Sequence, residues 1–259
     1  MDRSAIFVLA ACDDGPMIVA RTDAHKVGGM YVGVGVAMLE TGSHCQEEID
    51  ILLQLSKARA CQKPAGGFTV LDIGANIGAH TVPWAKFMTG WGRIIAIEAQ
   101  ERLFGALWGN ITINNCFNAR AVWAAAADTD GVMAGPSMDY CRPANFGGVS
   151  MLPEHNDQQP VLDYKQIVPT ITIDGLRLPR VDVIKIDVEG MEPQVLKGAA
   201  GTIAREYPII TAEHTTCGAR GIIDALPHDY RCRTQGMNML CMHRDDPIWK
   251  SVTGGVEAA

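Results

Sequence analysis

The chain has 259 residues, of which 47% are hydrophobic and 20% are charged, a composition that excludes a disordered or fibrous protein. The formal net charge is −7, and no block of Lys and Arg occurs anywhere. Because binding of nucleic acid depends on neutralising phosphates, nucleic acid is not an expected partner. A small or neutral substrate fits better. No stretch approaches the roughly 20 apolar residues of a membrane span.

The first twenty residues allow two interpretations. Residues 4–11 are apolar, and Leu9-Ala10-Ala11-Cys12 resembles a lipoprotein cleavage site. A secretory signal needs a positively charged N-terminal region, however, and here the negative charge of Asp2 offsets the positive charge of Arg3. The favoured interpretation is a hairpin, with a turn at Asp13–Pro16 and a second strand at Met17–Arg21. Residues 1–40 as a whole are predicted to form short strands broken by glycine pairs.

A helix is predicted over Gln46–Ala60, where Ile49, Leu52, Leu53 and Leu55 form an apolar stripe. From Phe68 onward, short apolar strands alternate with helices, which is typical of an α/β protein with a mostly parallel sheet. We expect strands at Phe68–Ile73, Arg93–Ile97, Ala119–Ala126, Val181–Ile186 and Ile209–Glu213, helices at Ile77–Met88, Leu103–Asn115 and from Glu192 to Ala199, and a final hairpin over Arg231–His243. The segment Asp128–Gln166 is predicted to be irregular.

The eight cysteines are scattered, and no two have the C-x-x-C spacing of zinc or redox sites. They are predicted to be ordinary small core residues in a reducing compartment, which favours the cytoplasm. The sequence leaves open whether the protein forms a homo-oligomer.

The first core strand ends in Asp72 and continues into Gly74, Asn76 and Gly78. Glycines at this point let the backbone approach a ligand closely. A dinucleotide site would instead have G-x-G-x-x-G, which is absent. A carboxylate at the strand end suits a positively charged ligand, so the ammonium and sulfonium of S-adenosylmethionine fit better than a pyrophosphate.

The second strand ends in Glu98, 20 residues after Gly78, where an acid accepts hydrogen bonds from ribose hydroxyls. The third strand ends in small residues up to Ala126, followed by Asp128. These residues would leave space for an adenine ring, and Asp128 would accept from its amine. Close packing of a helix on the sheet explains the alanines equally well.

A second group of titratable residues follows the later strands. Asp187 and Glu189 come directly after a buried strand that contains Lys185, and Glu213 and His214 end the next strand. Removal of a hydroxyl proton needs a base, and Asp187, Glu189 and His214 are the candidates. Lys185 is expected to pair with one of the acids, because an unpaired buried charge is costly. Asp187 with Glu189 or Glu213 would also suit a Mg²⁺-like ion. The spacing of these residues does not decide whether they act as a base or as metal ligands.

Several of these runs resemble the FkbM-family methyltransferases. They are Leu71–Gly78, Gly92–Glu98, Thr172–Asp174, Gly147–Ser150 and, most specifically, Ile184–Glu192, and the resemblance covers about residues 47–214. It implies a Rossmann-like class I methyltransferase fold with a seven-stranded sheet, and S-adenosylmethionine-dependent O-methylation of sugar, glycan or polyketide hydroxyls. Glu48 resembles an acid that the family carries before the core. The family usually has Pro after the ribose-binding acid, whereas this chain has Ala99-Gln100.

We therefore expect residues 1–62 to pack on or cap the cofactor site, and residues 63–259 to form the methyltransferase core. The predicted cofactor contacts are Asp72, Gly74, Asn76, Gly78, Glu98, Ala99, Ala126, Asp128 and Glu48. Three alternatives stay open: N- or C-methylation on the same fold, a nicotinamide-dependent oxidoreductase, and a non-catalytic binding module.

Overall fold

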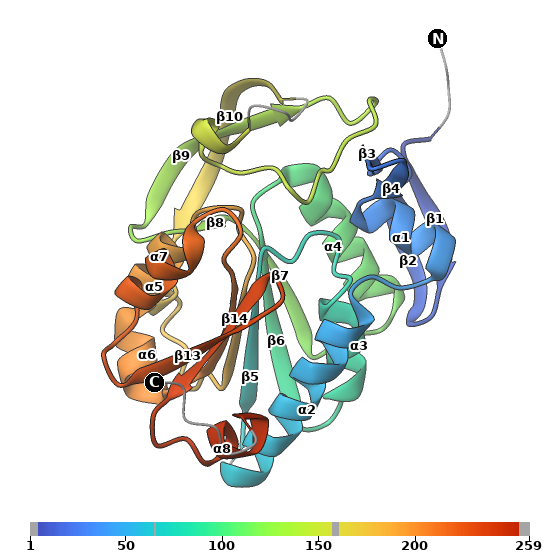
Figure 1. Cartoon of the computed structure of the whole chain (residues 1–259). Helices are drawn as coiled ribbons and strands as arrows, with labels where there is room; N and C mark the ends of the chain where they lie inside the picture. Colours follow the sequence, from blue (N-terminus) through green and yellow to red (C-terminus); the bar gives the residue numbers. More distant parts are fainter. Residues whose placement is uncertain (1–4, 65, 157–160, 254–259) are drawn as a thin grey trace.

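A seven-stranded sheet lies at the centre of the protein, with the strand order β13-β14-β12-β11-β5-β6-β7 (Figure 1). The computed structural model describes residues 5–64, 66–156 and 161–253; Ser4 of the apolar N-terminal stretch and residues 157–160 of the segment predicted to be irregular lie outside it. The strands are β5 (Phe68–Ile73), β6 (Gly92–Glu98), β7 (Ala119–Trp123), β11 (Val183–Ile186), β12 (Ile209–Glu213), β13 (Tyr230–Gln235) and β14 (Asn238–His243).

Five of these strands pair in parallel, and β14 alone runs against the others, because it pairs antiparallel with both β12 and β13. This arrangement confirms the predicted α/β, Rossmann-like, mostly parallel sheet. The order reverses between β5 and β11, which lie side by side although more than 100 residues separate them. In open α/β sheets, ligands bind beyond the carboxyl ends of the strands at such a reversal.

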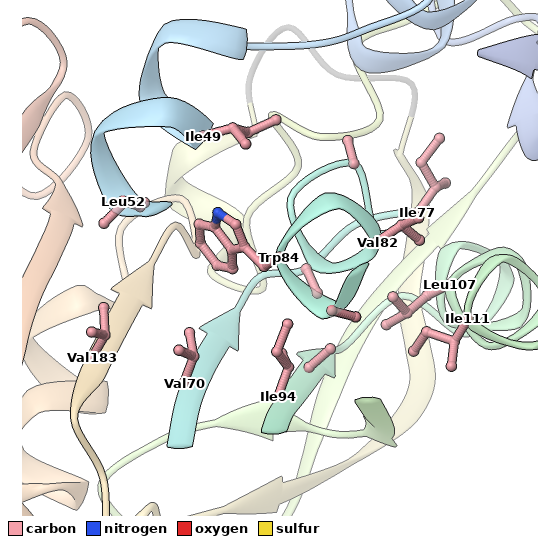
Figure 2. Packing of buried hydrophobic residues seen from close by; sticks show 14 of the residues in the cluster. Ile49, Leu52, Val70, Ile77, Val82, Trp84, Ile94, Leu107, Ile111 and Val183 are labelled. Carbon is pink, nitrogen blue, oxygen red and sulfur yellow. The ribbon is translucent and has the colours of Figure 1, made fainter. Parts of the chain in front are cut away.

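Helices cover both faces of the sheet (Figure 1). One face carries α2 (Gln46–Gln62), α3 (Thr81–Phe87) and α4 (Glu101–Ile113), and the other carries α5 (Glu192–Gly198), α6 (Ala200–Glu206) and α7 (Gly218–Ala225). On the first face Val183, Val70 and Ile94 stand in neighbouring strands beneath Trp84 of α3 and Leu52 of α2 (Figure 2). Within the described part of the chain, every helix is too short or too polar to cross a lipid bilayer.

The end of the described chain holds α2 in place. Asp246 precedes α8 (Pro247–Thr253), and its buried carboxylate accepts a hydrogen bond from the buried guanidinium of Arg59 on α2. Breaking a buried pair by removing one partner is strongly destabilising. The position of α2 therefore depends on residues almost 200 positions further along the chain.

The N-terminal segment forms the predicted hairpin, with β1 (Phe7–Cys12) and β2 (Gly15–Ala20) antiparallel, followed by a small hairpin of β3 (His25–Val27) and β4 (Met30–Val32). The prediction of strands up to residue 40 is wrong, because α1 occupies Val34–Thr41. The buried carboxylate of Asp23 accepts hydrogen bonds from the backbone N–H of Gly35, in the first turn of α1, and from that of Phe146. The periodicity of apolar residues cannot reveal hydrogen bonds between residues that are distant in the sequence, so it did not predict the start of α1.

The prediction that Asp128–Gln166 is irregular holds for residues 139–156, apart from one 3₁₀ turn, and is wrong for the two ends of the segment. β9 (Gly131–Met138) and β10 (Val161–Ile171) form a long antiparallel pair, and β10 also pairs with β8 (Ala125–Ala126), giving a second, three-stranded sheet. Pro136 and Pro169 and two shifts of register disguise these strands in the sequence. The predicted strand Ala119–Ala126 is accordingly split after Trp123 between two sheets. Short 3₁₀ turns lie at Pro153–His155 and Asp174–Leu176.

One cysteine pair departs from the prediction that all eight are ordinary thiols. Cys232 on β13 and Cys241 on β14 stand directly opposite each other and form a disulfide, whereas the other six are free. Their partnership results from the register of the hairpin and cannot be seen in their sequence spacing.

Candidate active site

A cavity of about 480 Å³ lies at the carboxyl ends of β5, β6, β11 and β12. Its floor is the sheet rim, and three covering segments close it: residues 32–34 before α1, residues 44–48 at the start of α2, and residues 145–149. The volume is within the range of ligand-binding pockets. Two of the covering segments are held together by Asp23, which binds both the start of α1 and Phe146.

The turn after β5 brings the backbone to the cavity. Gly74 has a φ of +80°, and a Cβ at this position would overlap the carbonyl oxygen of Asp187. The N–H groups of Gly74 and Ala75 both donate to the carbonyl of Ile97. Asn76 also has a positive φ, and Gly74, Ala75 and Asn76 line the cavity. Gly78 does not: it packs under α4, where a Cβ would lie 2.8 Å from Leu107.

Glu98, at the tip of β6, is buried and lines the cavity. Its two oxygens accept hydrogen bonds from the backbone N–H groups of Asn76, at 2.8 Å, and Gln100, at 2.7 Å. Burial raises the pKa of Glu98 to about 7, although these hydrogen bonds act against the shift. Ala99 and the residues from Ala124 to Ala126 complete this end of the wall.

Asp72 and Asp128 lie elsewhere, which corrects two of the predicted contacts. Asp72 is fully buried beneath the cavity and is not part of its wall; its carboxylate accepts a hydrogen bond from Thr81 Oγ1 and stands opposite Lys185 in the sheet. Asp128 is exposed and lies beside α5, where Gly198 packs closely on Ala127. Within the alanine run, Ala124–Ala126 line the cavity and Ala127 packs against Gly198 of α5.

The other end of the cavity is acidic. Carboxylate oxygens of Asp187, Glu189 and Glu213 lie within 4.8 Å of one another, and all three residues line the cavity. The buried carboxylate of Glu192 holds the turn that presents them, because it accepts hydrogen bonds from the N–H groups of Val188 and Gly190. Carboxylates that follow β11 and end β12 thus lie together at one rim of the sheet.

A buried cation sets the charge state of this cluster. Lys185 Nζ lies 3.0 Å from Asp187 Oδ2, as the pairing prediction required. Burial alone would lower the pKa of Lys185, but the carboxylates of Asp187, Asp72 and Glu48 outweigh it and raise this pKa. Burial likewise acts to raise the pKa of Asp187, and the Lys185 charge overcomes it, so that the pKa of Asp187 is lowered.

The other two acids of the cluster shift in the opposite direction. Burial, together with a hydrogen bond and charge from Asp187, raises the pKa of Glu213 to about 8. Burial and the Asp187 charge raise the pKa of Glu189 to about 7, although Thr216 donates a hydrogen bond to it. At neutral pH the cluster therefore combines an ionised Asp187 with two acids close to their titration midpoints.

His214 is not part of this cluster. It follows Glu213 in the chain, its backbone N–H donates to the carbonyl of Met237, and its side chain does not line the cavity. The structure therefore does not bring His214 together with Asp187 and Glu189, the other two predicted bases.

Two other histidines, missed in the sequence, do line the cavity. His80 Nε2 lies 3.6 Å from Glu48 Oε2. Burial works to raise the pKa of Glu48, but the neighbouring His80 and the charge of Lys185 lower it overall. Burial and the charges of His80 and Lys185 lower the pKa of His44 to about 4. Their positions in the sequence could have identified both as site residues, because His80 stands at the end of the glycine turn and His44 stands just before α2.

A family model described as the methyltransferase FkbM domain matches residues 72–225, more than half of the chain. The chain belongs to the FkbM methyltransferase family. Residues 72–225 are thus a methyltransferase domain of this family. No curated protein matches the sequence.

Solved structures similar to this FkbM-family chain are methyltransferases of several kinds. An FkbM methyltransferase from Methylobacillus flagellatus KT has 17% identity and a TM-score of 0.46, and the match covers 68% of this chain and 43% of that one. An O-methyltransferase from Bacillus cereus, in complex with SAH, has 15% identity over 80% and 86% of the two chains, with a TM-score of 0.46. A precorrin-6y C5,15-methyltransferase from Geobacter metallireducens GS-15 has 15% identity over 73% and 85%, with a TM-score of 0.39.

Proposed function

We propose that this FkbM-family protein transfers a methyl group from S-adenosylmethionine to a hydroxyl oxygen of a small-molecule acceptor of the sugar, glycan or polyketide type. The observation that carries the proposal is the acidic end of the cavity, where Lys185 keeps Asp187 ionised while Glu213 and Glu189 titrate near neutrality. A general base works best when its pKa lies near the operating pH.

The other end of the cavity fits the adenosyl part of the cofactor. A carboxylate has about four lone-pair sites, and the backbone uses one on each oxygen of Glu98, which leaves acceptors for two ribose hydroxyls. The small side chains of Ala99 and Ala126 leave room in the cavity wall for a planar adenine ring. The absence of a side chain at Gly74 lets the ligand approach the backbone. The sulfonium would then lie towards the carboxylates, which favour positive charge.

When bound, S-adenosylmethionine supplies the methyl group: a carbon–oxygen bond forms as the carbon–sulfur bond breaks with its electron pair left on sulfur. The protein's contribution is to place the acceptor hydroxyl in line and to take its proton. Glu213 is the best-placed base, because ionised Asp187 disfavours a second negative charge beside it and so makes Glu213 a strong proton acceptor. Glu189 is the neighbouring alternative.

A divalent cation is the second way in which the same cluster could acidify an acceptor. Three carboxylates converging within 4.8 Å are ligands that Mg²⁺ accepts. In that case Asp187, Glu189 and Glu213 would hold the ion, which would lower the pKa of a bound hydroxyl. A chelator would stop methyl transfer in this version and leave it unchanged when Glu213 acts directly as the base.

The test is transfer of label from methyl-labelled S-adenosylmethionine to matched pairs of acceptors that differ only in hydroxyl or amine. We expect label on the hydroxyl member, and its loss in Glu213→Gln but not in Glu101→Gln, an exposed control on α4. Transfer to amines alone would replace this proposal with N-methylation. Cofactor binding without transfer to any acceptor would favour a binding module, and tight NADH binding would favour an oxidoreductase.

A further inference from the structure

A second cavity, of about 200 Å³, lies between α2 and the hairpin β13–β14. On the helix side, Ile51, Leu52 and Leu55 form the apolar part of its wall, and Glu47 and Glu48 form the acidic part at the start of α2. Its wall on the sheet side is Thr211 of β12 and Leu240 of β14, which are direct neighbours in the sheet. This apolar space is not explained by the methyl-transfer site described above.

The helix places the lining residues on one side. Glu48, Leu52 and Leu55 are spaced by four and then three residues, which keeps them on one face of a helix. Glu48 stands at the end of this row nearest the main cavity, and Leu55 lies two turns further along α2. This face of α2 therefore begins with the acidic side chain of Glu48 and continues with the apolar side chains of Leu52 and Leu55.

The two cavities adjoin at the acidic end of the site. Glu48 and Asn238 line both of them, whereas Glu98 and the alanines line only the main cavity. Asn238 is also the direct sheet neighbour of Glu213, the proposed base. A molecule whose hydroxyl lies at Glu213 would thus meet the entrance to the second cavity immediately, on the side away from the adenosyl end.

The far rim of the second cavity is polar and open. Glu47, Gln235 and Gly236 contribute to the lining and are exposed. A chain that enters between Glu48 and Asn238 would therefore pass over Leu52, Leu55 and Leu240 before it reaches solvent. The space offers an apolar lining of limited length, and no charged side chain other than Glu47 and Glu48 takes part in it.

Resting on the proposed function, we propose that the acceptor carries a hydrocarbon arm next to its reactive hydroxyl, and that this arm binds between α2 and β13–β14. The acceptor class is then amphipathic, a hydroxylated alkyl, acyl or polyketide-like molecule, and not an unsubstituted sugar. Each methylene moved from water into this lining strengthens binding about fourfold. Ile51, Leu55 and Leu240 set the length and width of the arm that fits.

The test uses primary n-alkanols from butanol to octanol as probes, since they contain only a hydroxyl and a chain. Calorimetry on the full chain saturated with S-adenosylhomocysteine should show affinity rising by up to about fourfold per added methylene. Ile51→Trp fills the cavity from a half-buried position and should abolish this dependence on chain length. Ile51→Glu, which makes the wall polar, should do the same. Gln54→Trp, on the exposed side of α2, is the matched control and should leave it intact.

Unchanged affinity for S-adenosylhomocysteine shows that each variant is folded. Wild-type protein without any dependence on chain length, or a dependence that survives both substitutions at Ile51, overturns the inference. Methyl transfer to the alkanols is measured separately. Chain-length dependence without any transfer to oxygen would count against the proposed reaction but would support the arm site. Transfer to oxygen without chain-length dependence would support the reaction and count against the arm site.

Discussion

The carbonyl oxygen of Asp187 occupies the space in which Gly74 would carry a side chain, so the turn after β5 and the turn after β11 touch backbone to backbone. Gly74 also has a φ of +80°, which costs about 1–3 kcal/mol for other residues. We expect Gly74→Ala to lower the free energy of unfolding by at least about this amount and to displace Asp187.

Urea unfolding and cofactor binding measure both effects of Gly74→Ala. Gly105→Ala on α4 is the control, because a Cβ there meets nothing within 4 Å, and alanine stabilises a helix by about 0.5–1 kcal/mol relative to glycine. Equal stability of the two variants would show that the contact between the turns is not required.

Glu98→Gln should weaken binding of S-adenosylhomocysteine. The amide keeps the shape of the side chain but removes the charge, and it sets an N–H₂ group against a backbone N–H of Asn76 or Gln100. Loss of hydrogen bonds to a charged group costs about 1.5–3 kcal/mol, which corresponds to roughly 10- to 100-fold in Kd. Calorimetry measures the effect, with Glu101→Gln as the matched surface control. Wild-type affinity in Glu98→Gln would remove this residue from the proposed cofactor site.

The rate of methyl transfer should depend on pH through Glu213. Its pKa is about 8, so the ionised base is lost as the pH falls below that value, and kcat/KM should decrease with acidification. In Glu213→Gln we expect a fall of about 10²–10⁴ in rate and the disappearance of the inflection near pH 8. A pH profile that is the same in wild type and variant would exclude Glu213 as the base and favour Glu189.

The same raised pKa values link stability to pH. Glu213 and Glu189 have pKa values of about 8 and 7 when folded, compared with an ordinary value of 4.5. The folded state therefore binds more protons, and their contribution is fully present below pH 4.5 and is lost as the pH rises through 7 to 8. Urea unfolding between pH 5 and 8.5 should show a decline that becomes shallower in Glu213→Gln. A decline of equal slope in the variant would show that other groups cause it.

A chelator distinguishes the two proposed ways of activating the acceptor. If Glu213 acts directly as a base, methyl transfer should be unaffected by EDTA and by added Mg²⁺. If the three carboxylates hold an ion, EDTA should abolish transfer, Mg²⁺ should restore it, and Asp187→Asn should weaken Mg²⁺ binding measured by calorimetry. Cofactor affinity, followed in parallel, shows whether Asp187→Asn leaves the adenosyl end intact.

The sequence predicts the central sheet well because its strands are short, apolar and separated by amphipathic helices. Glu98, Asp187 and Glu189 could be located for a related reason: the carboxyl ends of parallel strands must share one rim. Strand ends alone cannot tell which way a side chain turns. His214 and Asp72 stand at the expected strand ends, yet one lies off the cavity wall and the other beneath it.

What could not be predicted depends on contacts between distant segments. α1 starts where Asp23 accepts a hydrogen bond from its first turn, and β9 pairs with β10 although the two strands are distant in the sequence. The register of the β13–β14 hairpin places Cys232 opposite Cys241. His80 and His44 become site residues only when α2 lies over the turn after β5. None of these relationships leaves a local periodic pattern.

With the acceptor arm bound against α2 as proposed, the buried pair of Arg59 and Asp246 would give the C-terminal region a part in substrate selection without any contact with substrate, because the pair holds α2 in place. Shortening the protein to end before Asp246, or replacing that residue, would leave the matched family domain at residues 72–225 complete while releasing the helix that carries Glu48 and Leu52. Such a shortened protein should keep its affinity for S-adenosylhomocysteine better than its discrimination among acceptors. Homologues that differ in this tail should therefore differ in what they modify before they differ in what they use as methyl donor.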